Sequence, residues 1–416
     1  MINPLRPISI SLSPNVQADD IKLAVSVMAQ PADFKEGPAI AELENEVKNY
    51  LGVKHAHSFN SGRSSLMAIM KALGLPDGSQ VLLQAFTCNA AVNPIRWAGL
   101  EPLYVDCDQN YNLSVEDLKK KITAKSRAVM VQHTFGQPAD MDEIKKFCDE
   151  NNLILIEDCA HSLGAEYKGK KVGTFGRAAF FSFGRDKMIS CVYGGMAVTD
   201  DDKLSQKIAA FQEECGYPDA DWVSQQLKHP ILMEKIVLPT YSIFGKLILR
   251  YFQWAHVLSK AIHWKEKRGL VPDYFPKRLP NALAVLAVNQ FKKLGAFNTH
   301  RHELAEFYYC ELKNSGYILP PRLSDRKAVY LRFAIRHDNA AKIIKKAWSK
   351  NLLIGDWYRT PVDPFDTLPE TVGYKQGSCP NAEEFSGKMI NLPTHINILK
   401  KEAKKVVKFI VNQDNK

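Results

Sequence analysis

Two short segments decide the fold: LILIED at residues 153–158 and AAFFSFGRDK at residues 178–187. Each begins as an apolar run of strand length and continues into polar residues, which include Asp158 in the first segment and Lys187 in the second. Similar apolar runs precede them at residues 81–83, 102–105 and 128–131, and helical stretches such as residues 140–151 separate several of the runs. Strands that alternate with helices predict an α/β fold with a mostly parallel sheet.

The 416 residues are enough for a large domain and a smaller one. Residues 216–275 break the alternation because they are rich in aromatic, proline and basic residues, so we expect an insertion there. Helical patterning resumes at residues 281–309. A strand-like run at 329–335 and helices at 339–350 and 400–411 follow. We therefore expect a large domain at 1–280, which contains the insertion, and a helix with a smaller α+β domain at 281–416.

Cysteine spacing and net charge narrow the classes of protein and of partner to be considered. The eight cysteines show neither a CxxC pair nor zinc spacing, and no secretory signal is visible, which favours a cytoplasmic protein with free thiols and no metal. The net charge of +10 suits a phosphorylated substrate, an anionic membrane surface or nucleic acid. Nucleic acid ranks last, because no nucleic-acid-binding module accompanies the charge.

Asp158 and Lys187 follow two separate strands, and ligands of parallel sheets bind at the carboxyl ends of strands. A lysine at such a position can form a Schiff base with an aldehyde cofactor, and a carboxylate facing a pyridine nitrogen keeps that nitrogen protonated. A solvated surface lysine and a helix-capping aspartate are the alternative interpretations. For either residue alone, the alternative is favoured.

The segment NSGRSS at residues 60–65 opens a helix at residues 66–73 and suits a phosphate group. Small polar residues at a helix N-terminus leave backbone N–H groups free, and the helix dipole adds to their attraction for an anion. Simple N-capping by Ser61 or Ser64 is an equally good interpretation of this segment. Ser182, five residues before Lys187, could give the same phosphate a hydroxyl group.

These segments together resemble the DegT/DnrJ/EryC1/StrS family of sugar aminotransferases, which use pyridoxal 5'-phosphate (PLP) and have fold type I. The resemblance rests on five segments that occur in the family's order: GPAIAELENEVKNYLGV (37–53), NSGRSSL (60–66), FGQPADMDEI (135–144), IEDCAHSLGAEYKGKKVGTFG (156–176) and FFSFGRDKMISCVYGGMAVTDD (180–201). A weaker likeness continues at RLPNALAVLAVNQFKKL (278–294) and MINLPTHINI (389–398).

The resemblance implies a role for each matching residue. Lys187 would bind PLP covalently and carry protons, Asp158 would pair with the pyridine nitrogen, and His161 would contact the phenolic oxygen. Gly62, Arg63, Ser64 and Ser182 would hold the phosphate. The family's usual reaction implies L-glutamate as amino donor and a nucleotide-linked keto-sugar as acceptor. It also implies a role in cell-surface polysaccharide or amino-sugar biosynthesis, and a homodimer.

Three departures from the family pattern concern the site. Arg63 replaces the usual threonine of the phosphate loop, and Cys88 stands where many relatives place the aromatic ring that stacks on PLP. The segment GDWYR at 355–359 replaces a histidine that is common in the carboxy-terminal domain. Two other functions therefore stay open: a PLP-dependent sugar dehydratase, and a PLP-fold binding or regulatory protein without catalysis. A lysine at position 187 favours transamination over dehydration.

Residues 242–260, within the expected insertion, have a helical pattern of their own. Lys246, Arg250 and Lys260 fall on one stripe, and apolar residues occupy most of the remaining surface. Such a helix can lie in a membrane interface, although basic residues interrupt an apolar run that is too short to span a bilayer. The favoured alternative is that the apolar face packs on the domain core or on a second subunit. Peripheral membrane contact at the inner face is the second interpretation.

Overall fold

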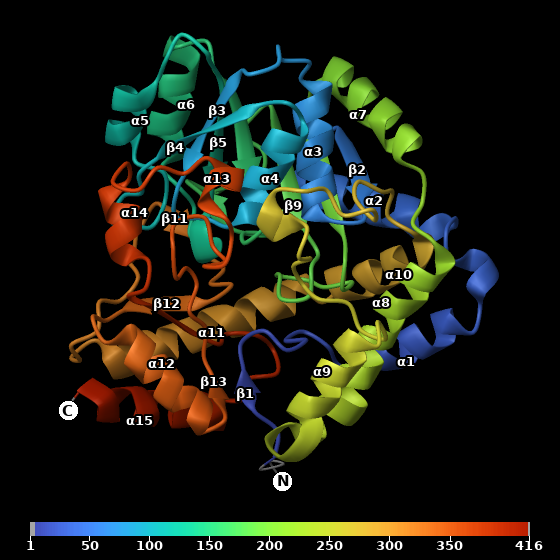
Figure 1. The fold of residues 1–416 in the computed structure, drawn as a ribbon, viewed down its shortest axis with the longest axis vertical. Helices are drawn as coiled ribbons and strands as arrows, with labels where there is room; N and C mark the ends of the chain where they lie inside the picture. The colour runs from blue at the N-terminus through green and yellow to red at the C-terminus, as the bar shows by residue number, and fades with distance from the viewer. Residues whose placement is uncertain (1–4, 415–416) are drawn as a thin grey trace.

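The computed structural model describes residues 5–414, and a seven-stranded sheet forms its centre (Figure 1). The strand order is β2 (His55–Phe59), β10 (Gly195–Thr199), β9 (Ala178–Ser182), β6 (Ile154–Asp158), β5 (Ser126–Gln132), β3 (Gln80–Gln84) and β4 (Glu101–Val105). Strand β10 runs antiparallel to both of its neighbours, and the other pairs are parallel. The α/β fold with a mostly parallel sheet is therefore confirmed.

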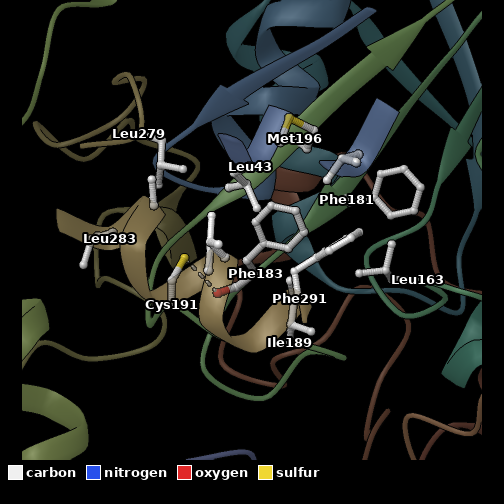
Figure 2. Packing of buried hydrophobic residues seen from close by; sticks show 14 of the residues in the cluster. Leu43, Leu163, Phe181, Phe183, Ile189, Cys191, Met196, Leu279, Leu283 and Phe291 are labelled. Atoms are coloured by element: carbon white, nitrogen blue, oxygen red, sulfur yellow. Dashed lines mark hydrogen bonds between the residues drawn. The ribbon is translucent and has the colours of Figure 1, made fainter. Parts of the chain in front are cut away.

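Helices cover both faces of this sheet, so its strands are apolar on both sides. One face packs against α2 (Pro38–Leu51), α8 (Ala220–Leu232) and α10 (Asn281–Phe291). The other face packs against α3 (Gly62–Ala72), α4 (Asn89–Trp97) and α7 (Asp202–Cys215). Helices α5 (Val115–Lys121) and α6 (Met141–Glu150) continue the cover of the first face over β3, β4, β5 and β6. Figure 2 shows Phe181, Phe183 and Met196 in the first cluster, together with Leu43 of α2 and Phe291 of α10.

Helix α2 shows how the local sequence sets these elements. Pro38 occupies the first turn, where its missing N–H costs no hydrogen bond. Leu43, Val47 and Leu51 are buried on one face, as their spacing predicts. Gly52 ends the helix in the left-handed conformation at φ 77°, which a glycine adopts without strain.

The carboxy-terminal part builds a separate hydrophobic cluster around α11 (Leu294–Leu312), α12 (Ala340–Ser349) and α15 (Lys400–Asp414). Strand β12 (Phe333–Arg336) pairs with β14 (Met389–Leu392), and β1 (Ile8–Ser9) pairs with β13 (Leu352–Leu353). The remaining elements are α1 (Ala18–Met28), β7 (Glu166–Tyr167), β8 (Lys170–Lys171), α9 (Lys246–Trp254), β11 (Arg326–Lys327), α13 (Pro369–Val372) and α14 (Pro380–Phe385).

Two sequence expectations need correction in this part. The helical stretch expected at 281–309 is two helices, α10 and α11, which are interrupted between Phe291 and Leu294. The strand expected at 329–335 begins only at Phe333, because the N–H groups of Val329 and Leu331 donate to the carbonyl oxygens of Gly136 and Phe135 instead. Within residues 5–414 no helix is both long and apolar enough to cross a bilayer.

Glu157 ties the central sheet to the loop that precedes β9. Its side chain is fully buried and accepts hydrogen bonds from the backbone N–H groups of Gly173 (2.7 Å), Phe175 (2.6 Å) and Gly176 (2.8 Å). Successive strand residues point to opposite faces, so Glu157 serves the fold while Asp158 faces the other way.

We expect Glu157→Ala to destabilise the protein by about 3 to 5 kcal/mol, because three backbone N–H donors lose their buried, charged acceptor. The free energy of unfolding in urea measures this loss. Glu116→Ala is the matched control, since the Glu116 side chain is 82% exposed. Equal stability of the two variants would contradict the role given to Glu157.

Candidate active site

The carboxyl ends of β5, β6 and β9 bring Gln132, Asp158 and Ser182 to one edge of the sheet. Parallel strands place these ends at the same side, as the sequence analysis expected. A cavity of about 150 Å³ opens there. Its lining includes all of the predicted site residues except Ser64: Gly62, Arg63, Asp158, His161, Ser182 and Lys187.

Asp158 is buried and faces the cavity. One of its oxygens accepts the N–H of Ala160 at 3.0 Å. Burial raises the pKa of Asp158 to about 6, and the positive charge of Lys187 only partly opposes this shift. A carboxylate that is held in a dry site attracts a cation strongly, which suits a protonated ring nitrogen.

Lys187 is positioned through its backbone. The side-chain amide of Asn15 donates to the carbonyl oxygens of Lys187 (2.7 Å) and Met188 (3.1 Å). Arg301, itself buried, donates to the other side of the Asn15 amide at 2.9 Å. The Lys187 ammonium group lies 5.3 Å from the centre of the Trp357 ring. The sequence analysis did not foresee this contribution of the amino-terminal segment.

His161 presents a hydrogen-bond donor to the cavity. Burial lowers its pKa well below the ordinary range, so the ring is neutral near pH 7. Its Nδ1 accepts the N–H of Phe135 at 3.4 Å, which leaves the proton of the neutral ring on Nε2. An Nε2–H group suits an anionic oxygen on a bound ring.

Trp357 and Tyr358 supply the aromatic surface that Cys88 cannot. Both rings line the cavity, and they lie nearly parallel with centres 5.8 Å apart. Trp357 also stacks on His161, while Tyr358 stacks on Phe135. The residues come from the 355–359 segment, whose departure from the family pattern was visible in the sequence but whose place in the site was not.

The N-terminus of α3 forms a cup beside the cavity. Ser61 caps the helix by accepting the N–H of Ser64 at 3.0 Å, and the hydroxyl of Ser64 donates to Asn60 at 2.7 Å. Ser64 therefore holds the turn together from behind the lining. A side chain at Gly62 would meet the Cβ of Ser182 at 3.0 Å, so glycine permits the close approach of helix and strand.

The cup is strongly cationic. A hollow of about 70 Å³ is lined by Arg63, Ser182 and Arg185 among others. The buried Nε of Arg185 has no partner among the described residues, which suits an anionic ligand. Arg63 pairs with the fully buried Glu266 of the expected insertion, so its side-chain charge is partly neutralised. Arg185 was not among the predicted site residues, although it precedes Lys187 by two residues.

A second carboxylate enters the cavity from the carboxy-terminal part. Asp363 accepts the N–H of Arg359 at 2.9 Å, and burial raises its pKa to about 6. Taken together, the cavity offers an amine, a buried carboxylate, a ring-sized aromatic wall and an anion cup. The residues present fit PLP.

Comparisons with known proteins agree with this geometry. A model of the DegT/DnrJ/EryC1/StrS aminotransferase family matches residues 15–233 and 259–411. The GDP-perosamine synthase of Vibrio cholerae is 41% identical over 172 residues, which cover 41% of this chain and about half (47%) of that protein.

Solved structures share the fold over nearly the whole chain. Helicobacter pylori PseC, an aminotransferase involved in the biosynthesis of pseudaminic acid, superposes with a TM-score of 0.77 at 20% identity, covering 99% of this chain and 100% of that chain. A Streptococcus pneumoniae protein solved in the PLP form superposes with a TM-score of 0.75 at 17% identity, covering 99% and 98% of the two chains.

We expect Asp158→Asn to stabilise the cofactor-free protein at about pH 8 by about 2 kcal/mol while it weakens PLP binding. The folded-state pKa of about 6 exceeds the ordinary 3.8. Folding therefore favours the protonated acid, and the charged form opposes folding once the pH rises through that window. Urea denaturation at about pH 8 and about pH 4 measures the difference, which should shrink at the lower pH. A loss of stability at about pH 8 would refute the assignment.

We expect Trp357→Ala to raise the dissociation constant for PLP roughly tenfold, because the cavity loses aromatic contact surface. Equilibrium dialysis of cofactor-free protein measures this constant without reference to turnover. Trp254→Ala is the control, since the Trp254 side chain is 76% exposed and lies on α9. Unchanged affinity in the Trp357 variant would remove this ring from the binding surface.

Proposed function

The chain belongs to the DegT/DnrJ/EryC1/StrS aminotransferase family and is a PLP-dependent enzyme, and we propose that it moves the amino group of L-glutamate onto a nucleotide-linked keto-sugar. One observation carries this proposal: a lysine amine and a buried carboxylate line one cavity, and the anion cup beside it shares Arg63, Ser182 and Lys187 with that cavity. Family membership alone leaves the donor and the acceptor open, so both are part of the proposal.

The cofactor would be held at three places. Asp158 would receive the ring nitrogen, His161 the phenolic oxygen, and the cup at Gly62, Arg63, Ser64 and Ser182 the phosphate, with Arg185 as an added cation. When bound, PLP supplies an electron-withdrawing ring that makes the α-proton of an amino acid acidic. The carboxylate of Asp158 keeps the proton on the ring nitrogen and so maintains that withdrawal.

Lys187 is the one amine among the described residues that line the cavity. Its Nζ would therefore take the proton from the α-carbon of the donor and deliver a proton to the acceptor side in the return half of the reaction. Asn15 holds the Lys187 backbone, so the flexible side chain swings from a fixed point. Trp357 and Tyr358 limit water at the reacting atoms.

A second, larger cavity supports an anionic acceptor. It has a volume of about 630 Å³ and adjoins the first at Asp186 and Trp357. Arg185, Lys246 and Arg332 line it. Arg332 is buried, donates to Asp186 at 2.8 Å and lies 3.2 Å over the Trp357 ring. These cations suit the phosphates of a nucleotide-linked sugar, and a similar protein is named for a GDP-linked product.

We further propose a homodimer, a cytoplasmic location and a role in cell-surface polysaccharide or amino-sugar synthesis. Membership of this family supports these points. A sugar dehydratase would release no 2-oxoglutarate. Incubation with L-glutamate and a panel of nucleotide keto-sugars, followed by assay of 2-oxoglutarate, therefore separates the two reactions and names the acceptor.

We expect Lys187→Ala to abolish transfer of the amino group, because no other amine of the described lining can move the proton. A second measurement needs no substrate. Treatment of the unaltered protein with PLP and borohydride should add the mass of the cofactor to the peptide that contains Lys187. Lys203→Ala, an exposed lysine on α7, is the control and should keep both properties. An active Lys187 variant, or a label on another side chain, would contradict the proposal.

A further inference from the structure

Residues 234–258 stand apart from the family. The family match stops at residue 233 and resumes at residue 259, so this stretch has no counterpart in the family model. From residue 235 to residue 265 the sequence contains five lysines and arginines and no acidic residue. The segment forms α9 and the short helical turns before it, at the lower edge of the molecule in Figure 1.

One face of α9 packs inward. Ile248, Leu249 and Phe252 lie against a small cluster formed by Met233, Val237, Leu238 and Leu258. Lys246, Leu249 and Gln253 line the cavity of about 630 Å³ beside the active site. These inward contacts therefore hold α9 in its position on the rest of the chain.

The opposite face is apolar and open. Five large side chains, which we call the α9 outer face, are exposed by 45 to 76%: Ile243, Phe244, Leu247, Tyr251 and Trp254. Leu247, Tyr251 and Trp254 are spaced three or four residues apart on α9, so they share one side of that helix, and Ile243 and Phe244 lie in the helical turn before it. Their aromatic and aliphatic composition is typical of helices that lie in the interface of a bilayer. No residue of α9 itself is buried in the described chain.

Two basic helices lie along the same edge in Figure 1. Helix α12 and the residue after it carry four lysines and no acid, and α15 carries five lysines between residues 400 and 408 with one glutamate. None of these lysines forms an ion pair with another residue of the described range 5–414. Asn351, which follows α12, donates a hydrogen bond to Ser242 just before α9, so the surfaces are joined.

We propose that this edge docks on an anionic phospholipid bilayer, with the α9 outer face in the interface and the lysines of α12 and α15 over the headgroups. Three basic segments, which are residues 235–265, α12 with Lys350, and residues 400–408 of α15, together carry more positive charge than the net +10 of the whole chain. The remaining residues are therefore slightly acidic in sum. Anionic headgroups complement this asymmetry. A second copy of the chain would place like charges against each other across a two-fold axis. Docking at this edge does not depend on which sugar the enzyme uses.

Co-sedimentation of the full chain with vesicles tests the proposal. We expect binding to vesicles of phosphatidylcholine with phosphatidylglycerol, weak binding to phosphatidylcholine alone, and release at high salt. The double variant Leu247→Ser, Trp254→Ser should lower the partition coefficient at least about tenfold, because the helix loses two interfacial anchors. The variant Lys405→Ala, Lys408→Ala should lower binding only to the anionic vesicles.

A matched control exchanges two exposed apolar residues elsewhere on the surface. Val25 on α1 and Phe365 are 53 and 58% exposed, and Val25→Ser, Phe365→Ser should sediment like the unaltered protein. Failure of the unaltered chain to bind anionic vesicles would overturn the proposal, and so would equal binding by the Leu247, Trp254 variant. A change in oligomeric state of that variant without any vesicle binding would assign the face to a protein interface instead.

Discussion

The site depends on one constraint: the carboxylate of Asp158 is kept in a dry position at the end of a central strand. Water would stabilise its charge, and burial removes that stabilisation, which is why the pKa of Asp158 rises to about 6. The β5–β6–β9 arrangement fixes the carboxylate, and the rings of Trp357 and Tyr358 close the space in front of it. Burial of the charged carboxylate is unfavourable by itself, but it gives the site a strong attraction for a ring nitrogen that carries a proton.

The sheet was readable from the sequence because its strands are buried on both faces and appear as apolar runs between helices. The motif residues were also readable, since Asp158 ends β6, and His161 and Lys187 lie in the segments that follow β6 and β9. Ser64 was expected to help hold the phosphate, and in the fold its hydroxyl donates to Asn60 within the turn. Trp357 and Asp363, which line the cavity, and Asn15, which holds the Lys187 backbone, were missed because they lie more than one hundred residues away from Lys187 along the chain. No local pattern predicts such contacts.

Residues 242–260 also show what the sequence pattern can and cannot predict. Periodicity separated a basic stripe from an apolar surface at residues 242–260, but it could not tell which apolar residues face inward. In the fold, Ile248, Phe252 and Leu258 pack against the chain, while Leu247, Tyr251 and Trp254 stay open. Because the inner face of α9 also borders the large cavity, this one helix connects an outer surface with the space next to the reacting atoms.

The contact between Asn15 and the loop of Lys187 bears on how the protein is produced. The carbonyl oxygens of Lys187 and Met188 both depend on the side-chain amide of Asn15, which lies outside the central sheet. A truncated chain that begins at Met28 would keep every strand of the large sheet and every family motif. Such a product would nonetheless lack the group that fixes the lysine, so an intact motif would not guarantee a competent enzyme.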